Sequence, residues 1–426
     1  FQVAYTYGGG VIHTTVPKEE EDFSKPFSSL DDIVNTVVLP DLMFAKENLP
    51  SSWTGGDIGR ATWGAATAML GKIYLYRQEW SAAAAEFKEV IDSEIYSLTP
   101  DIMDNFTDLN EFNSESILEV AYSDVLAPGA PGAAVDDTPF ASGAEASAMA
   151  RALGQLNFGA FNTVLPSYYL HELYLNDEVD SLNPINDGNM HSKRMNGSIV
   201  PRNGEGLYYN LEVGERGGWG FGQSAYVKKY TNWYDMDSED IQSRSGINFR
   251  HIRLADVYLM YAEAVLNADA DVATAITYID LVRSRAGVVT LQQYLDQNGN
   301  MFPQLHISKQ VHGEDQPMVA PTVENVMTHI QRVERPLELA FEGHRWKDLV
   351  RWGIVQEVFN ELRADEKWRE DNQAELGLTN GGVEPLFIVQ RIRPDFFLSS
   401  QNYTPERHNY FPIPTQEVQT NTMIGE

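Results

Sequence analysis

The sequence predicts a mainly α-helical fold in which tetratricopeptide-like helix pairs pack against an irregular, loop-rich half that contains short β-strands. Three observations predict it. A helix-pair spacing near residue 70 recurs after residue 249. Long segments rich in Gly, Asn and aromatic residues separate the helical regions. The hydrophobic content of 43% is that of a globular chain, and it includes no apolar run long enough to span a membrane.

The clearest repeat lies between residues 59 and 95. A Leu-Gly-x-x-Tyr motif starts at Leu70, and an Ala-x-x-x-Phe motif starts at Ala83. This order and spacing is typical of a tetratricopeptide unit, in which small residues let two antiparallel helices approach closely. We expect Asp57 to cap the first helix and Ser81 to cap the second.

Two further helical segments follow the same reasoning. Residues 249–286 show apolar residues at helical spacing on both sides of a turn at Asp269–Asp271, which predicts a second helix pair. Residues 322–348 predict a third, continuous long helix. Its apolar face is expected to contain Val333, Leu337, Phe341 and Leu349.

The remaining segments contain few helix formers. Residues 127–134 are expected to form a loop, and residues 380–414 an irregular or short β segment. Residues 184–245 are predicted to be long loops, with a short strand at Ala225–Tyr230. We divide the chain into residues 1–125, an N-terminal helical part, and residues 126–426, a C-terminal part packed with it as one unit.

Composition narrows the possible functions. The formal net charge is -30, so the protein is expected to repel nucleic acid. The chain has no cysteine, which excludes disulfides, thiol nucleophiles and cysteine-ligated zinc. The sequence begins within a helix-like segment, so we expect it to be part of a longer protein.

One helical stripe carries carboxylates that could suggest catalysis. Glu334, Glu338 and Glu342 lie at i, i+4 spacing. Glycoside hydrolysis needs two carboxyl groups that flank the scissile bond, and these usually come from different elements. Because Arg335, Arg345 and Arg351 interleave with the stripe, we favour a structural ion-pair network over a catalytic pair.

No cofactor is predicted, with calcium as the one alternative. Asp235, Asp237 and Glu239 resemble the start of a calcium loop. Asp240 occupies the position where such a loop needs glycine, and no glutamate closes it.

Aromatic residues of the predicted loops are the best candidates for ligand binding. A pyranose has an apolar face that stacks on an aromatic ring and a rim of hydroxyls that need polar partners. We predict a stacking platform of Trp219, Trp233 and Tyr234, flanked by Tyr208 and Tyr209, with Asn232 serving the hydroxyls. The alternative is that these rings fill a small core under the loops.

Several segments carry a family resemblance. They include Ile252–Ala264, Arg332–Gly353 and Tyr410–Val418. In this order and spacing the chain resembles the SusD/RagB family of outer-membrane glycan-capture lipoproteins, with a first part of the family domain not included. The resemblance implies a SusD-like fold of helix pairs with a ligand-binding loop half.

The resemblance also implies a function. It is non-catalytic binding of a polysaccharide or oligosaccharide at the cell surface and delivery to a SusC-like TonB-dependent transporter. The net acidity favours a neutral glycan. The implied location is the outer membrane, held by a lipid anchor that this chain does not contain. The alternatives are capture of peptide or another nutrient by the same arrangement, and an α-helical glycoside hydrolase.

Overall fold

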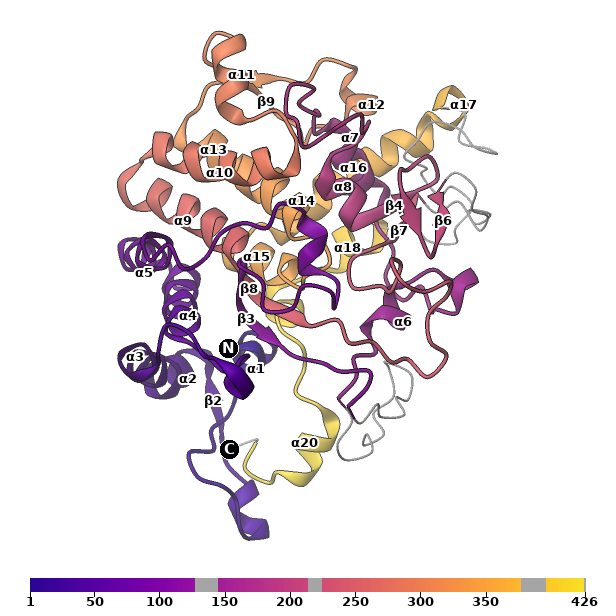
Figure 1. The fold of residues 1–426 in the computed structure, drawn as a ribbon. Helices are drawn as coiled ribbons and strands as arrows, with labels where there is room; N and C mark the ends of the chain where they lie inside the picture. Colours follow the sequence, from indigo (N-terminus) through magenta and orange to yellow (C-terminus); the bar gives the residue numbers. More distant parts are fainter. Residues whose placement is uncertain (127–144, 214–223, 377–395, 425–426) are drawn as a thin grey trace.

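The computed structural model describes residues 1–126, 145–213, 224–376 and 396–424. The predicted loop at 127–134 and the residue Trp219 therefore lie outside the described residues. Helix pairs occupy one side of the molecule, and a region of short strands and loops occupies the other (Figure 1). We call the segment from α6 to β8 the loop half.

The first helix pair confirms the tetratricopeptide spacing. Helix α4 (Trp63–Tyr76) and helix α5 (Trp80–Asp92) pack against each other. A Cβ added at Gly71 would lie 2.6 Å from the Phe87 ring, so only glycine permits this close approach. The predicted caps are wrong. Thr62 accepts the Ala65 N–H at the start of α4, and α5 begins at Trp80 without a side-chain cap.

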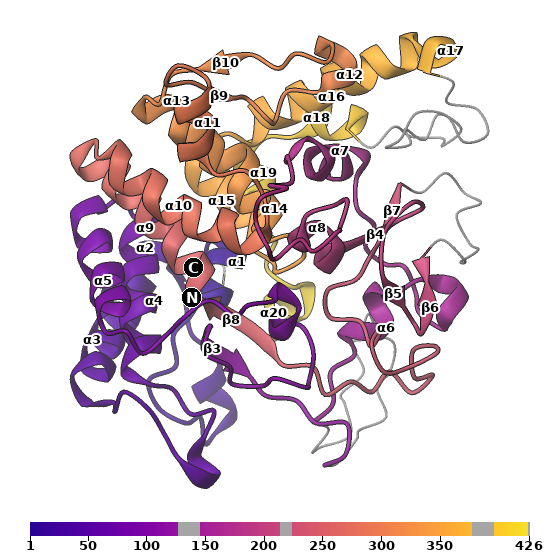
Figure 2. The same ribbon diagram turned by 45° about the horizontal axis from the view of Figure 1, so that its top comes forward.

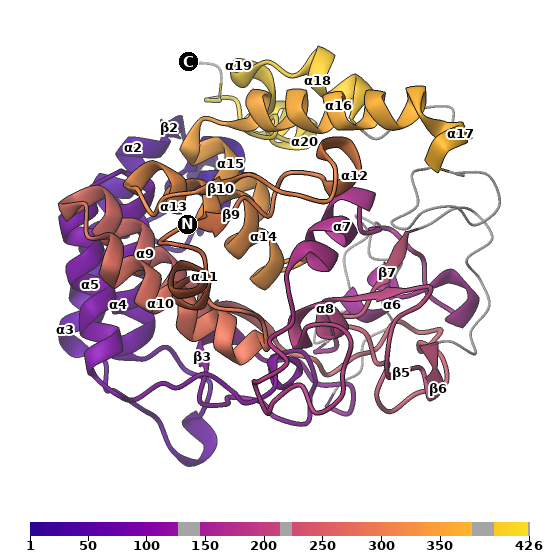
Figure 3. The ribbon, with the colours of Figure 1, turned by 90° about the horizontal axis from the view of Figure 1, so that it is seen from above.

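The second helix pair is also confirmed. It consists of α9 (Leu254–Asp269) and α10 (Val272–Ala286), and Asp271 caps α10 by accepting the Thr274 N–H. Helix α5 packs on α9, and α3 (Leu39–Asn48) packs on α4. The helices stack side by side in all three ribbon views (Figures 1–3). Their shared apolar faces form the largest hydrophobic core.

The predicted third helix is not continuous. It consists of α13 (Val323–His329), a π-helical turn (Ile330–Glu334) and α14 (Arg335–Glu338), and it ends before α15 (Arg345–Trp352). Helix α14 ends with Leu339 as its C-cap, and Phe341, with a φ of 65°, lies in the turn that separates it from α15. The break follows from tertiary contacts, because it lets the buried Glu342 reach Lys229 and Arg253.

The strands form five two-stranded antiparallel sheets within the described residues. The strand predicted at Ala225–Tyr230 is confirmed for its first three residues, which form β7. The paired strands are β1 (Gly9–Val11) with β2 (Phe27–Ser29), β3 (Ser116–Val120) with β8 (Phe249–Arg253), β4 (Ile199–Pro201) with β7 (Ala225–Val227), β5 (Leu207–Tyr208) with β6 (Leu211–Glu212), and β9 (Phe302–Pro303) with β10 (Met318–Val319).

Shorter helices and the long α16 complete the fold. Residues 397–408 are largely helical, so the prediction of an irregular segment is wrong there, and residues 380–395 lie outside the described part. The remaining helices are α1 (Gln2–Tyr7), α2 (Leu30–Ile33), α6 (Met149–Leu153), α7 (Tyr168–Asn176), α8 (Lys193–Ser198), α11 (Leu291–Gln297), α12 (Lys309–His312), α16 (Val355–Asp371), α17 (Gln373–Leu376), α18 (Phe397–Asn402), α19 (Pro405–His408) and α20 (Thr415–Thr420).

Two features bear on the organisation of the chain. Strand β3, from the first predicted part, pairs with β8, from the second, so a sheet joins the two parts. The division at residue 125 itself stays a prediction.

Across the described ranges, no helix combines the length and the apolar character needed to cross a bilayer.

Candidate ligand-binding site

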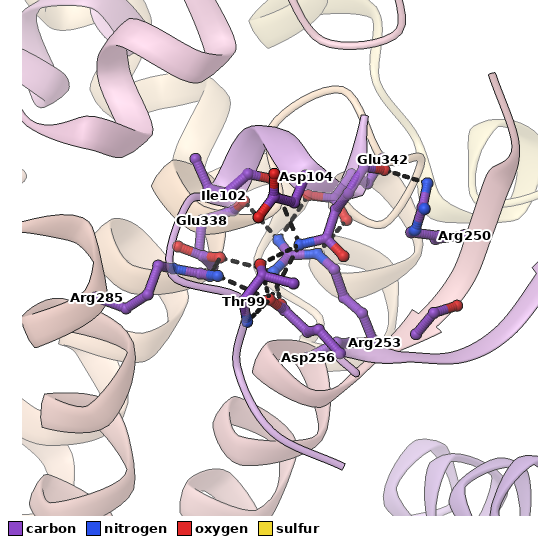
Figure 4. Close-up of polar contacts among 12 residues, drawn as sticks. Thr99, Ile102, Asp104, Arg250, Arg253, Asp256, Arg285, Glu338 and Glu342 are labelled. Atoms are coloured by element: carbon purple, nitrogen blue, oxygen red, sulfur yellow. Dashed lines mark hydrogen bonds and ion pairs between the residues drawn. The ribbon is translucent and has the colours of Figure 1, made fainter. Parts of the chain in front are cut away.

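The glutamate stripe is a buried ion-pair network, as predicted, but its partners are not the neighbouring arginines. Glu338 and Glu342 both bind Arg253, which comes from β8. The Arg253 guanidinium donates to Glu338 Oε1 at 2.7 Å and to both carboxylate oxygens of Glu342 at 2.8 Å. It also donates to Glu115 at 2.8 Å, and Arg285 bridges Glu115 and Glu338. Figure 4 shows Arg253, Arg285, Glu338 and Glu342 within this network.

The third glutamate belongs to a second cluster. Glu334 accepts from Arg194 at 2.5 Å and from Arg283 at 2.9 Å, and both arginines also bind Asp177. The predicted partners have other roles. Arg335 binds Asp256 and Asp348, Arg351 binds Glu263 and Asp348, and Arg345 donates to the Gln331 carbonyl.

This network buries the stripe out of reach of a substrate and keeps Glu342 ionised. Burial alone would raise the pKa of Glu342, but the positive charges of Arg253 and Lys229 outweigh it and lower that pKa to about 2. A carboxyl group with so low a pKa cannot serve as a general acid near neutral pH. The network instead joins Glu115, directly before β3, to β8, α10 and the chain after α14.

Two tyrosines and the asparagine of the predicted platform are buried in a core of the loop half. Tyr208 donates to the Val227 carbonyl at 2.9 Å, and Tyr209 donates to Glu239 at 2.6 Å. Asn232 uses its side-chain amide on Glu239 and its oxygen on Ser245. All three side chains are buried, so a ligand would reach them only if neighbouring groups moved.

Trp233 and Tyr234 lie closer to the surface and contact each other edge to face, with ring centres 5.8 Å apart. Trp233 packs on the same loop-half core, and the Lys228 ammonium lies 3.8 Å from its ring centre. The Trp233 indole N–H has no hydrogen-bond partner among the described residues. Tyr234 donates to Asp108 Oδ1 at 2.7 Å. Which of the six predicted residues contact a ligand stays a prediction.

The sequence did not single out Lys228 or Asp108 for this site. Burial lowers the pKa of Lys228 to about 8, so its charge is poorly solvated. Asp108 comes from a segment 126 residues before Tyr234. Neither position has a local pattern that would identify it, because only the folded chain brings these residues together.

The segment proposed for calcium distributes its carboxylates among protein partners. Asp237 accepts from Asn210 at 2.8 Å, whereas Glu239 accepts from Tyr209 and Asn232. Burial raises the pKa of Glu239. Within the ranges that the structure describes, no group of three or more His, Cys, Asp or Glu residues is arranged to hold a metal ion.

An apolar cavity of about 550 Å³ lies between α7, α14, α15 and α16. Its walls include Leu170, Leu339, Phe341 and Leu362, with few polar groups. Such a lining offers a sugar little hydrogen bonding, so it matches the predicted ligand poorly.

Paired helices that carry a loop half with aromatic residues define a helical-repeat scaffold. The model of the SusD family matches residues 199–425, more than half of the chain. The chain therefore belongs to the SusD family, as its C-terminal segments predicted.

Individual relatives agree with this assignment. SusD-like protein P25 of Formosa agariphila is 26% identical, and the match covers 93% of this chain and 64% of that protein. A SusD-like protein of Bacteroides ovatus is also 26% identical, over 62% of this chain and 46% of its own length. The chain thus spans less than two thirds of either relative.

Solved structures show the same fold. A SusD superfamily protein from Bacteroides vulgatus has a TM-score of 0.69 at 25% identity, over 99% of this chain and 74% of its own. A structure described as a laminarin-binding SusD-like protein has a TM-score of 0.57 at 22% identity, over 99% of this chain and 74% of its own.

Proposed function

We propose that this protein binds a neutral polysaccharide or oligosaccharide without cleaving it and delivers it to a SusC-like TonB-dependent transporter. One observation supports Trp233 as the centre of the binding site. Trp233 stands at the edge of the loop-half core with an indole N–H that no described residue accepts. A buried donor without a partner is unfavourable by about 1–3 kcal/mol, so a ligand hydroxyl that displaces the covering groups and accepts this N–H gains from the contact.

Family membership supports the ligand class. One structural neighbour is described as a carbohydrate-binding protein and another as laminarin-binding. The net charge of -30 disfavours anionic glycans through long-range repulsion. The transporter partner, the lipid anchor and the outer-membrane location are proposed from membership in the family.

The carboxylates support binding over hydrolysis. Glu338 and Glu342 are the best placed by spacing, yet both are buried and bound by Arg253. A retaining or inverting hydrolase needs an acid that holds a proton near neutral pH and a second carboxylate across the scissile bond.

Isothermal titration against neutral glycans, anionic glycans and peptides tests the proposal. We expect binding of at least one neutral glycan, with modest affinity, because a shallow aromatic platform gains little beyond the cost of association. An assay for new reducing ends on the same glycan should stay at background. Binding of peptides alone would contradict the glycan proposal, and steady release of reducing ends would contradict the non-catalytic one.

A further inference from the structure

A second pocket, of about 500 Å³, opens in the helical half of the molecule. Three segments build it: residues 51–62, which lead into α4; residues 95–96, which follow α5; and residues 111–119, which enter β3. We call it the helical-half pocket. Its size is that of a small-molecule site, and none of the six residues predicted from the sequence lines it.

Three aromatic side chains line the helical-half pocket and are fixed by nearby groups. The Trp53 indole N–H donates to the Ala61 carbonyl at 2.8 Å, which sets the ring orientation. The Tyr96 hydroxyl lies 3.4 Å from the Thr62 hydroxyl. Trp53 and Tyr96 are half-buried, and Phe112 is 37% exposed. The pocket therefore offers aromatic rings that do not need to be ordered on binding.

Phe112 is held in place against its own backbone preference. Its φ of 48° is a left-handed conformation that is rare for a bulky residue. Its N–H donates to Glu119 at 2.8 Å, and Arg250 holds the buried Glu119 carboxylate at 3.0 Å. Its ring lies against Gly59, where an added Cβ would approach to 2.9 Å.

The strained conformation of Phe112 contributes little to the packing of the hydrophobic core, because the Phe112 ring is substantially exposed. Residues held in strained backbone conformations cluster at functional sites. The observation points to the exposed part of the ring as a contact surface at the pocket.

Polar groups surround these rings. Ser51, Ser52 and Ser114 line the pocket, together with the carboxyl group of Glu111. Burial, and after it the negative charges of Glu119 and Asp108, raise the pKa of Glu111, so this end of the pocket is surrounded by acidic groups. Arg60 is paired with Asp57 at 2.8 Å. Such a pocket suits a ligand with apolar faces and uncharged hydroxyls, and it opposes an anion.

We infer that the helical-half pocket is a second carbohydrate-binding site for a neutral glycan segment, with Trp53, Tyr96 and Phe112 as the stacking residues. This inference rests on the proposed function. A glycan long enough to occupy this pocket and the Trp233 region together binds more tightly than a short glycan fragment, because its second contact with the protein is then intramolecular.

The test is isothermal titration of the full chain with an oligosaccharide that binds the wild type and with its parent polysaccharide. We expect two sites per chain for the oligosaccharide. Trp53→Ala and Phe112→Ala combined should leave one site and weaken binding of the polysaccharide at least tenfold. Phe44→Ala is the matched control, because Phe44 on α3 is 68% exposed and does not line the pocket.

A second pair of variants separates binding from folding. Gly59→Ala keeps every aromatic ring but displaces Phe112, so it should reproduce the loss. Tyr96→Phe keeps the ring and should bind within about threefold of wild type if stacking dominates. Circular dichroism and the thermal midpoint establish that each variant is folded.

The outcomes distinguish the two proposals. If the wild type binds the glycan, and the folded double variant and Gly59→Ala keep wild-type stoichiometry and affinity, the second site is refuted while the proposed function stands. If the wild type binds no glycan, the proposed function fails and the second site fails with it.

Discussion

The ammonium of Lys228 lies 3.8 Å from the centre of the Trp233 ring. Lys228 is 5% exposed, and no carboxylate within the described residues lies within ion-pair distance of it. One face of the indole is thus taken by a buried cation, which fixes the ring at the edge of the loop half. A sugar can stack only on what remains of the ring, and this relationship yields the first two predictions.

Replacing Trp233 by Ala should weaken glycan binding about tenfold, because the stacking surface and the unpaired indole N–H are both removed. Isothermal titration with the best ligand of the glycan panel measures the change. Trp368→Ala is the control, since this half-buried tryptophan lies on α16. Equal losses in both variants, or none in Trp233→Ala, would rule out Trp233 as a ligand contact.

Replacing Lys228 by Met should stabilise the protein at pH 7. The folded-state pKa of Lys228 is about 8, below the ordinary 10.5, so the folded state disfavours the charged form. The destabilising effect is fully present below pH 8 and is relieved as the pH rises from 8 to 10.5. We expect a gain on the order of 1–3 kcal/mol at pH 7 that shrinks above pH 8.

Urea unfolding of the wild type and of Lys228→Met at pH 7 and at pH 9.5 measures this difference. The exposed Lys367, replaced by Met, serves as the control and should show a small difference at both values. A difference for Lys228→Met that is the same at both pH values would contradict the prediction.

Arg253→Met should destabilise the protein severely. The substitution leaves Glu115, Glu338 and Glu342 buried with part of their compensating charge removed. Breaking a buried ion pair in this way costs about 3–5 kcal/mol. Chemical unfolding should show this loss, whereas Lys88→Met, in an exposed pair with Asp92, should cost less than about 1 kcal/mol. A loss as small as that of the control would show that the network contributes little.

The same network should make the protein sensitive to acid. The folded-state pKa of Glu342 is about 2, below the ordinary 4.5, so its stabilising effect is present above pH 4.5 and is lost as the pH falls toward 2. Glu342→Gln should be less stable at pH 7 but should lose stability less steeply below pH 4.5. The free energy of unfolding from pH 7 to pH 3 measures both slopes, and parallel curves would contradict the assignment.

Local sequence patterns were sufficient to predict the elements whose contacts lie within a short stretch of sequence. The motifs at Leu70 and Ala83 placed the first helix pair, because Gly71 and Phe87 meet within one hairpin of helices. The predicted helix caps were wrong because several polar residues precede each helix. Only the folded backbone shows whether one of their side chains accepts a hydrogen bond from a helix N–H. Phe341 fits a helical spacing, yet α14 ends at Glu338, and Phe341 lies in the following turn with a φ of 65°.

The candidate site was less accessible to sequence reasoning. The sequence predicted the aromatic residues of the loop half as one group, but burial separates Tyr208 and Tyr209 from Trp233 and Tyr234. In irregular loops, the order of apolar and polar residues does not predict which side chains are buried. The sequence did not predict the helical-half pocket, because Trp53, Tyr96 and Phe112 come from three separate segments.

The sequence alone determined the paired helices, the family and the structural character of the glutamate stripe, because helical periodicity and motif order are properties of neighbouring residues. Only the tertiary structure decided which charges pair and which rings are exposed. Arg253 meets Glu338 across 85 residues of chain, and Gly59 meets the ring of Phe112. Contacts between residues so far apart depend on how the helices and loops pack, which no local pattern encodes.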